Sequence, residues 1–438
     1  MKLFSFRGGI HPYDGKAMSK DLPIAEAKAG KELVYPLQQH IGAMAKPVVS
    51  KGDRVLVGQK IAEAQGFVSA SIYATVSGNV RIIEQRRTGS WSMVDSIVIV
   101  NDEQYEEVEY PKRKPWEELN AEEILEYIRE AGIVGMGGAA FPTHVKLSPK
   151  DPQAIQYVIA NCSECEPYLT SDYRRLMEEP ERIVLGLKIV LKLFPNATGL
   201  FGVEDNKMDA AVKLRALTQD DPRFKVCICK SKYPQGAERQ LIKALTGREL
   251  NSTKLPADVG CIVLNVDTLY SITRAVCEGR PLLHRIVTVT GDAIEKPQNF
   301  AVRIGTSYEE LVEQAGGFAK EPVRIVSGGP MMGNALPDLK VPVMKASSAL
   351  LCMTRDETEQ YSPTACIRCG RCLDACPEHL MPTNLAELAL RWDREGFLKL
   401  NGMECIECGS CSYVCPAGRR LAHAIKAVRR TIIEERRR

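Results

Sequence analysis

The pattern of apolar and polar positions predicts different elements in different parts of the chain. Between residues 47 and 83, short valine and isoleucine runs alternate with glycine turns, which is typical of strands joined by tight connections. From about 120 to 275, apolar strand-like runs alternate with amphipathic segments such as 121–131 and 181–193. Because strands that alternate with helices indicate layered packing, this part predicts an α/β domain.

The remaining chain changes its pattern twice. Residues 282–345 contain strand-and-turn segments around one expected helix at 308–315, and residues 346–438 end in a basic helix. The polar, proline-containing segment 101–117 suits a linker. We therefore expect a multidomain α/β protein whose domains occupy residues 1–105, 118–278, 280–345 and 350–438.

The overall composition is that of a soluble globular protein. The chain has 438 residues, of which 45% are hydrophobic and 26% charged. The net charge of +3 is too small to indicate nucleic-acid binding, so we expect no nucleic-acid partner. No uncharged apolar run approaches the ~18 residues that span a bilayer. The first residues lack the apolar core of a secretory signal, so we expect an intracellular protein.

Eight of the fifteen cysteines fall in the window 366–415. Such clustering in a reducing compartment indicates metal binding rather than disulfides. The spacing C-x2-C-x2-C-x3-C-P occurs twice, 39 residues apart, and matches the run of bacterial two-cluster ferredoxins. In such runs the fourth cysteine binds the other run's cluster. We therefore predict two [4Fe–4S] clusters, one held by Cys366, Cys369, Cys372 and Cys415 and the other by Cys405, Cys408, Cys411 and Cys376.

Structural zinc is the alternative for these cysteines, since it also takes four thiolates. Two interlocked runs that end in Cys-Pro match the pairs of a zinc site poorly. The 28 residues between Cys376 and Cys405 include an expected helix at 384–392, which favours an α-helical ferredoxin domain. Clusters transfer single electrons, so the chain also needs an electron donor and an acceptor.

A glycine-rich loop, GMGGAAFPTHVK at 135–146, follows the helix expected at 121–131. Three glycines within four residues allow the backbone to approach a ligand, and exposed N–H groups there can bind phosphate or the edge of a flavin. Lys146 adds a positive charge. By itself, such a loop is more often a simple turn.

An expected strand at 157–160 ends in the polar segment NCSECEP at 161–167. In α/β domains, ligands bind at the carboxyl ends of strands. Asn161 can bond to a flavin or its ribityl chain, and Glu164 and Glu166 can accept hydrogen bonds from ribose hydroxyls or a nicotinamide amide.

Other candidate metal ligands are interpreted as structural. Cys162 and Cys165 have a CxxC spacing, but no second pair lies near them in the sequence, so we expect packing residues. His11, His40 and His144 lack the spacing of metal ligands.

Four segments together resemble the NADH-oxidising flavoprotein subunit of respiratory complex I. The glycine-rich loop is similar to its FMN-binding pattern GRGGAGFPTGxKW, and 161–167 to its NADExEPG. Residues 233–238 resemble its GEE segment, and 265–268 its NNVET. The resemblance implies an FMN and NADH site formed by Gly135, Gly137, Gly138, Ala139, Phe141, Lys146, Asn161, Glu164, Glu166, Glu238 and Asn265.

The chain departs from that family at several points. Met136 replaces the loop arginine, Ser163 an aspartate, and Ala237 one of two adjacent glutamates. The duplicated cysteine repeat replaces a single-cluster domain. An alternative function is therefore an iron–sulfur electron-transfer adaptor without flavin or NADH chemistry of its own, and Met136 is its best support.

The two β-rich parts also resemble known domains. The first is similar to the barrel-sandwich fold of biotinyl and lipoyl domains, but residues 66–70 lack the lysine that would carry a cofactor, so we expect a structural module. Residues 282–345 resemble a soluble-ligand-binding β-grasp domain.

In this combination of domains the whole chain resembles the C component of the Rnf (Rsx) electron transport complex. The resemblance implies a peripheral subunit on the cytoplasmic side of the cell membrane, in a ferredoxin:NAD+ oxidoreductase that couples electron transfer to Na+ or H+ movement. Its cofactors would be FMN and two [4Fe–4S] clusters, with NAD(H) as substrate. Its partners would be the other subunits, with ferredoxin reached indirectly through one of them.

One other family is an alternative to this one. The A component of the Na+-translocating quinone reductase is similar over the N-terminal part but lacks the ferredoxin repeat.

The tail at 419–438 contains eight Lys or Arg and two Glu. A solvated basic helix is the simplest interpretation, and docking to an acidic partner or to anionic lipid is the alternative.

Overall fold

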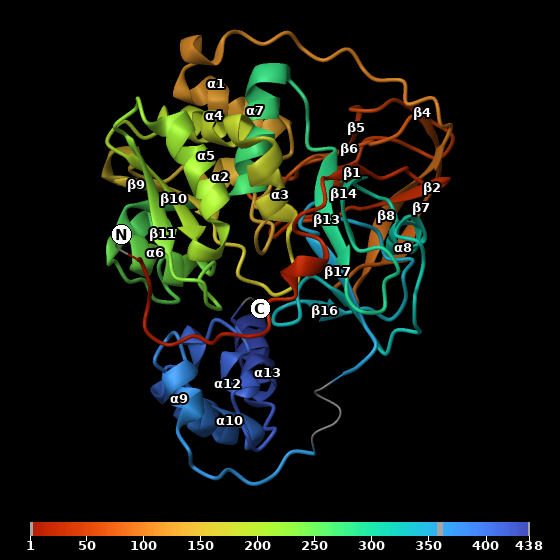
Figure 1. The fold of residues 1–438 in the computed structure, drawn as a ribbon. Coiled ribbons are helices and arrows are strands. Elements are labelled where there is room, and N and C mark those ends of the chain that lie inside the picture. The colour runs from red at the N-terminus through yellow and green to blue at the C-terminus, as the bar shows by residue number, and fades with distance from the viewer. Residues whose placement is uncertain (1–2, 357–361, 437–438) are drawn as a thin grey trace.

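The computed structural model describes residues 3–356 and 362–436. An α/β domain and a small helical C-terminal domain lie on one side of the molecule, and two β-rich domains lie beside the α/β domain (Figure 1). Within the described residues, no helix is both long and apolar enough to cross a bilayer.

The first β-rich domain consists of two small antiparallel sheets. One has the order β2-β8-β7-β4 and the other the order β3-β5-β6. Leu33, Ile61, Ile72 and Ile97 are at most 1% exposed and pack between the sheets, as the alternating pattern predicts. The strands are β2 (Glu32–Pro36), β3 (Lys46–Pro47), β4 (Arg54–Val55), β5 (Lys60–Glu63), β6 (Ile72–Tyr73), β7 (Gly78–Arg87) and β8 (Met93–Asn101).

The α/β domain has a four-stranded parallel sheet in the order β11-β10-β9-β12. Helix α1 begins after Asn120, whose side chain and that of Glu123 form a capping box, and the helix confirms the amphipathic segment predicted there. The strands are β9 (Tyr157–Cys162), β10 (Thr198–Glu204), β11 (Phe224–Cys229) and β12 (Cys261–Asn265). The helices are α1 (Ala121–Glu130), α2 (Thr143–Lys146), α3 (Ser171–Glu178), α4 (Pro180–Leu191), α5 (Met208–Thr218), α6 (Glu238–Thr246) and α7 (Val266–Glu278).

The second β-rich domain is a six-stranded mixed sheet in the order β1-β14-β13-β17-β15-β16, with helix α8 packed in its core. Strand β1, close to the N-terminus, runs parallel to β14, and β17 lies between β13 and β15. The sheet therefore combines a strand from the N-terminal part of the chain with a strand that ends at residue 353. The elements are β1 (Ala25–Glu26), β13 (His284–Thr290), β14 (Gln298–Arg303), α8 (Tyr308–Gln314), β15 (Arg324–Ser327), β16 (Asn334–Ala335) and β17 (Ala349–Met353).

The N-terminal residues before β1 do not enter the first domain. Phe4 pairs with Cys229 at the edge of the α/β sheet, and Ile10 pairs with Tyr233. Gly9 N donates to Ala375 O in the C-terminal domain at 3.0 Å. The segment thus passes between the α/β and C-terminal domains (Figure 1) and ties them together.

The C-terminal domain is helical, as predicted. Helix α10 packs on α13 through Leu385, Leu421, Ile425 and Val428, which are at most 2% exposed. On α13, Lys426 and Arg429 form ion pairs with Glu407, so part of the basic tail is engaged within its own domain. The helices are α9 (Arg371–Ala375), α10 (Pro382–Leu390), α11 (Arg394–Lys399), α12 (Ser410–Tyr413) and α13 (Leu421–Glu435).

Candidate functional site

The strand order of the α/β sheet reverses at β9. The chain continues from β9 to β10 and β11 on one side, whereas β12 pairs with β9 on the other. In parallel sheets, such a reversal opens a crevice at the carboxyl ends of the strands, where ligands bind. Asn161 is the penultimate residue of β9, Asn265 is the last residue of β12, and the two lie opposite each other in register. Both predicted residues therefore lie at the position that this topology reserves for a ligand.

The two asparagines organise the loops around the crevice. Asn161 Nδ2 donates to Gly236 O at 2.8 Å, which fixes the segment before α6. Asn265 Nδ2 donates to Asp172 Oδ2 at 2.6 Å. Its Oδ1 accepts from Asp267 N at 2.8 Å and so caps α7.

The glycine-rich loop lies against this strand end. Gly135 N donates to Phe141 O at 2.8 Å and closes the base of the loop. Met136 and Ala140 are buried, whereas residues 137–139 between them are exposed. A Cβ on Gly137 would lie 3.0 Å from Asn265 Nδ2, and one on Gly138 would meet nothing within 4 Å. The loop therefore presents bare backbone beside an open space, which fits a ligand that approaches the main chain.

Lys146 and Glu238 form an ion pair beside β12. Lys146 Nζ bonds to Glu238 Oε2 at 3.0 Å and donates to Val263 O at 3.1 Å. The two side chains are 25% and 39% exposed. A half-exposed ion pair of this kind adds little stability. The ammonium group can therefore turn to an anionic ligand at small cost.

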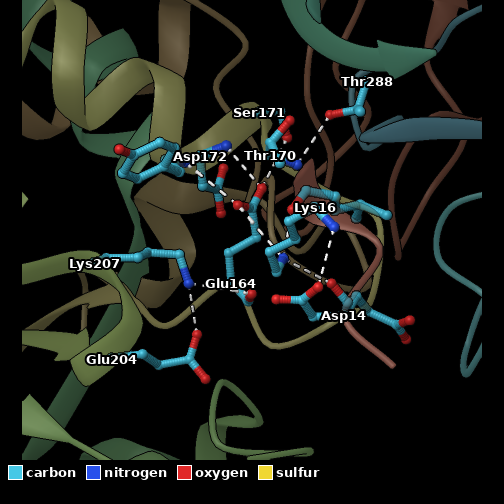
Figure 2. Close-up of polar contacts among 12 residues, drawn as sticks. Asp14, Lys16, Glu164, Thr170, Ser171, Asp172, Glu204, Lys207 and Thr288 are labelled. Atoms are coloured by element: carbon cyan, nitrogen blue, oxygen red, sulfur yellow. Dashed lines mark hydrogen bonds and ion pairs between the residues drawn. The ribbon is translucent and has the colours of Figure 1, made fainter. Parts of the chain in front are cut away.

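Glu164 has partners within the protein (Figure 2). Its Oε1 accepts from Asp172 N at 2.9 Å and from Ser171 Oγ at 3.3 Å, and its Oε2 accepts from Tyr173 N at 3.4 Å. It thereby caps the N-terminus of α3, where a negative charge is favourable. Lys16 Nζ lies 4.0 Å from Glu164 Oε2.

Lys16 anchors the N-terminal segment to the polar strand end. Its Nζ donates to Glu166 O at 2.9 Å, and a second bond goes to Leu169 O. Burial lowers the pKa of Lys16, against the opposing charge of Glu164. A second buried pair, Lys207 Nζ to Glu204 Oε2 at 2.7 Å, lies beside it (Figure 2). These contacts fix the backbone around the predicted acidic residues.

Glu166 joins the α/β domain to the β-grasp domain. Its carboxylate accepts from Met331 N at 3.2 Å and Met332 N at 2.9 Å. Burial raises the pKa of Glu166 to about 7, although the two N–H bonds oppose the shift. A Cβ on Gly329 would lie 2.1 Å from Glu166 Oε2, so the turn needs glycine there. Both predicted carboxylates are thus engaged with protein groups.

Asp172 was not identified from the sequence, yet it lies beside the loop through its bond to Asn265. Burial raises the pKa of its carboxyl group to about 7, and the charges of Glu164 and Asp267 add to the shift. Shifted carboxyl groups next to a ligand crevice are candidates for proton binding. The available sequence signal was its place in the first turn of the helix that follows the polar strand end.

Four cysteines line one apolar cavity in the C-terminal domain. Its walls include Leu380, Leu385, Ile406 and Ile425. The four are Cys376, Cys405, Cys408 and Cys411, so the first run contributes its fourth cysteine to the second set. Burial raises the pKa of the Cys405 thiol to about 12, so a cluster bound there would displace protons.

The other predicted set lies nearer the surface. Cys366 and Cys369 are exposed. Burial raises the pKa of the Cys372 thiol, and the charges of Cys415 and Cys366 add to the shift. Over the described part of the chain, no three His, Cys, Asp or Glu side chains gather tightly enough to hold a single metal ion. A cubane instead gives each thiolate its own iron atom.

The duplicated runs have duplicated backbones. Arg368 N donates to Cys366 Sγ and Glu407 N to Cys405 Sγ, both at 3.4 Å. Arg368 and Glu407 have φ of 57° and 59°, and the glycines two residues further on have φ of 78° and 79°. Both loops therefore direct N–H groups at sulfur in the same way, which favours the thiolate.

The cavity of the second set adjoins the α/β domain. Tyr233 Oη donates to Cys408 O at 2.8 Å. Arg239 Nη1 lies 3.2 Å from Glu378 Oε2 and 3.0 Å from Glu404 Oε2. These contacts hold the buried cysteines against the domain that contains the glycine-rich loop.

Models of known domain families match the four regions of the chain. The RnfC barrel sandwich hybrid domain matches residues 4–104, and the Nuo51 FMN-binding domain matches 128–274. The SLBB domain matches 286–335, and the 4Fe-4S dicluster domain matches 365–419. These matches confirm the expected fold class.

A known structure shows the same fold, and curated sequences show the family. An NAD+-reducing [NiFe]-hydrogenase chain in the air-oxidized state is similar in fold, with a TM-score of 0.51 at 15% identity over 93% of this chain and 83% of that one. The C component of the proton-translocating ferredoxin:NAD(+) oxidoreductase complex of Clostridium ljungdahlii is 46% identical over 88% of this chain and 84% of its own length. The Na(+)-translocating counterpart of Acetobacterium woodii is 44% identical over 100% of this chain and 99% of its own length. The chain therefore belongs to the RnfC family, the C components of ion-translocating ferredoxin:NAD(+) oxidoreductase complexes.

Proposed function

We propose that this chain is the component of such a complex that exchanges electrons with NAD(H), using FMN at the glycine-rich loop and two [4Fe–4S] clusters at the eight cysteines. The observation that carries the proposal is the reversal of strand order at β9, which places the glycine-rich loop at the carboxyl end of β12. Gly137 lies against Asn265 there, and Lys146 pairs with Glu238 and bonds to Val263 O of β12. The cavity of four cysteines lies against the same domain.

The residues of the crevice suit FMN. When bound, a flavin supplies the step between a two-electron hydride donor and one-electron carriers. The exposed backbone at 137–139 would face the ligand, and Lys146 would bind an anionic group. Asp172, with a pKa of about 7, would hold a proton at its carboxyl group next to Asn265. Glu164 and Glu166 would shape the crevice through their bonds to backbone N–H groups.

The two cysteine sets suit two cubanes with different surroundings. We assign Cys405, Cys408, Cys411 and Cys376 to the cluster against the α/β domain, and Cys366, Cys369, Cys372 and Cys415 to the other. Because Cys366 and Cys369 are exposed, their set faces the side open to a partner protein of the complex. Exposure and hydrogen bonding to sulfur also tune cluster potentials, so the two clusters should differ in potential.

The partners follow from the family. We propose a peripheral position on the cytoplasmic side of the membrane, with ferredoxin reached through another component of the complex. One relative is named as proton-translocating and the other as Na(+)-translocating. We therefore attribute the choice of ion to other components of the complex.

The test is flavin binding by the full chain, purified without oxygen and with both clusters present. Titration should quench FMN fluorescence at one FMN per chain, and NADH should then bleach the visible absorbance of the flavin. Failure to bind FMN with both clusters intact would leave an electron-transfer adaptor without flavin chemistry.

A further inference from the structure

We propose that Arg285, carried by the β-grasp domain, is the positioning residue that holds the glycine-rich loop in its ligand-binding shape. The inference rests on the proposed function, because it concerns the same loop. Arg285 lies on β13, is 1% exposed, and is the largest of the fully buried side chains among the described residues. A buried guanidinium needs strong partners to offset its lost hydration.

Met136 of the loop supplies two of those partners. Arg285 Nη1 lies 2.8 Å from Met136 Sδ, and Nη2 lies 3.4 Å from Met136 O. On the other side of the same residue, Met136 N donates to Thr268 Oγ1 at 3.1 Å. Both backbone groups of Met136 are therefore held by residues outside the loop. This is the position at which the flavoprotein pattern has an arginine within the loop itself.

Asp267 balances the charge. Arg285 Nη1 forms an ion pair with Asp267 Oδ2, and Arg175 Nε donates to Asp267 Oδ1 at 2.9 Å. Arg175 also pairs with Glu179, so two arginines meet two carboxylates. Arg285 Nε donates to Ser347 O at 3.0 Å, which fixes the guanidinium from its own domain. Breaking a buried pair of this kind leaves an uncompensated charge.

The consequence for the loop is a fixed base and a free tip. Gly135 is tied to Phe141, and Met136 is tied to Thr268 and Arg285, so freedom remains only at 137–139. A ligand that binds such a loop orders fewer residues and loses less affinity to entropy. Without Arg285 the base loosens, and the ligand must order it on binding.

The experiment compares three variants of the full chain with both clusters present. Arg285→Met removes the charge and its hydrogen bonds. Arg285→Lys keeps the charge but loses the planar guanidinium, whose two terminal nitrogens reach Met136 and Asp267. Arg324→Met is the control, since it removes another β-grasp arginine, one that pairs with Asp356. We expect the FMN dissociation constant to rise about 10- to 100-fold in Arg285→Met, less in Arg285→Lys, and not at all in Arg324→Met.

A rescue separates positioning from general stability. Arg285→Met combined with Met136→Arg returns a guanidinium to Asp267 from the loop side, so most of the lost affinity should return. Amide hydrogen exchange at residues 135–141 should be faster in ligand-free Arg285→Lys than in the wild-type chain. This measurement tests the inference even if Arg285→Met does not fold. If wild-type chain binds FMN and both Arg285 variants bind it equally well with unchanged exchange, the inference is wrong and the proposed function stands. If wild-type chain binds no FMN, the proposed function itself fails.

Discussion

The cysteine repeat and the glycine-rich loop assemble their sites in different ways. Each cysteine run supplies three sulfur atoms from one short loop, and the two loops share the same backbone angles and N–H bonds to sulfur. The proposed flavin site draws Gly137 from the loop between α1 and α2, Lys146 from the end of α2, Glu238 from the start of α6 and Asn265 from the end of β12. A cluster site therefore depends mainly on its own loop, whereas the crevice depends on the sheet and on a neighbouring domain.

The prediction with the largest effect tests whether each cysteine run is self-contained, because we propose that the fourth cysteine of each run binds the other run's cluster. Cys376→Ala with Cys405→Ala should damage one cluster and leave about four iron atoms per chain, since both line the same cavity. Cys376→Ala with Cys366→Ala should damage both clusters and leave almost none. Iron analysis and EPR of the reduced chains measure this. The reverse pattern would mean that each run binds its own cluster.

A smaller effect sharpens the contrast at the crevice. Gly137→Val places a side chain against Asn265, and it should weaken FMN binding about tenfold or more, or roughly 1.4 kcal/mol. Gly138→Ala is the control for folding, because a Cβ at this position meets open space. This substitution should leave the melting temperature of the ligand-free chain unchanged. FMN titration and thermal melts decide. Equal FMN affinity of Gly137→Val and wild-type chain would place the flavin elsewhere.

Glu166 joins the α/β domain to the β-grasp domain and should make the free energy of unfolding depend on pH. Its folded-state pKa of about 7 lies above its ordinary value of 4.5, so the folded state keeps a proton that the unfolded state has released. Stability should therefore fall as pH rises from about 4.5 to 7 and level off above 7, with roughly 1 kcal/mol of the loss between pH 6 and 8. Glu166→Gln should lose that part of the slope. Denaturant unfolding at both pH values measures it, and parallel slopes would exclude Glu166 as the source.

The smallest effect concerns backbone strain within the loop. Ala140 has φ of 54°, a conformation that a residue with a Cβ rarely adopts. Ala140→Gly should raise the free energy of unfolding by about 0.5–1 kcal/mol. Ala139→Gly, at a position without positive φ, should lower it slightly. A loss of stability in Ala140→Gly equal to that in Ala139→Gly would show that the strain is absent in solution.

The same contrast explains how much the sequence could predict. The cysteine spacing and the helices at α1 and α10 follow from local patterns, and the structure has both helices. The roles of Glu164 and Arg285 could not be predicted in this way. Glu164 caps a helix that begins seven residues later, and Arg285 reaches the loop from another domain. Strand β1 has only two residues and pairs with β14 far along the chain, so it is too short for an alternating sequence pattern to predict it.

The central claim is that NAD(H) and the clusters communicate through the flavin crevice of this chain. The direct measurement is EPR of the anaerobic full chain after NADH addition, with FMN present and with FMN removed. We predict cluster reduction only in the FMN-loaded chain, and its loss in Gly137→Val with cluster content unchanged. Equal cluster reduction with and without FMN, or none although FMN is bound and bleached by NADH, would contradict the account.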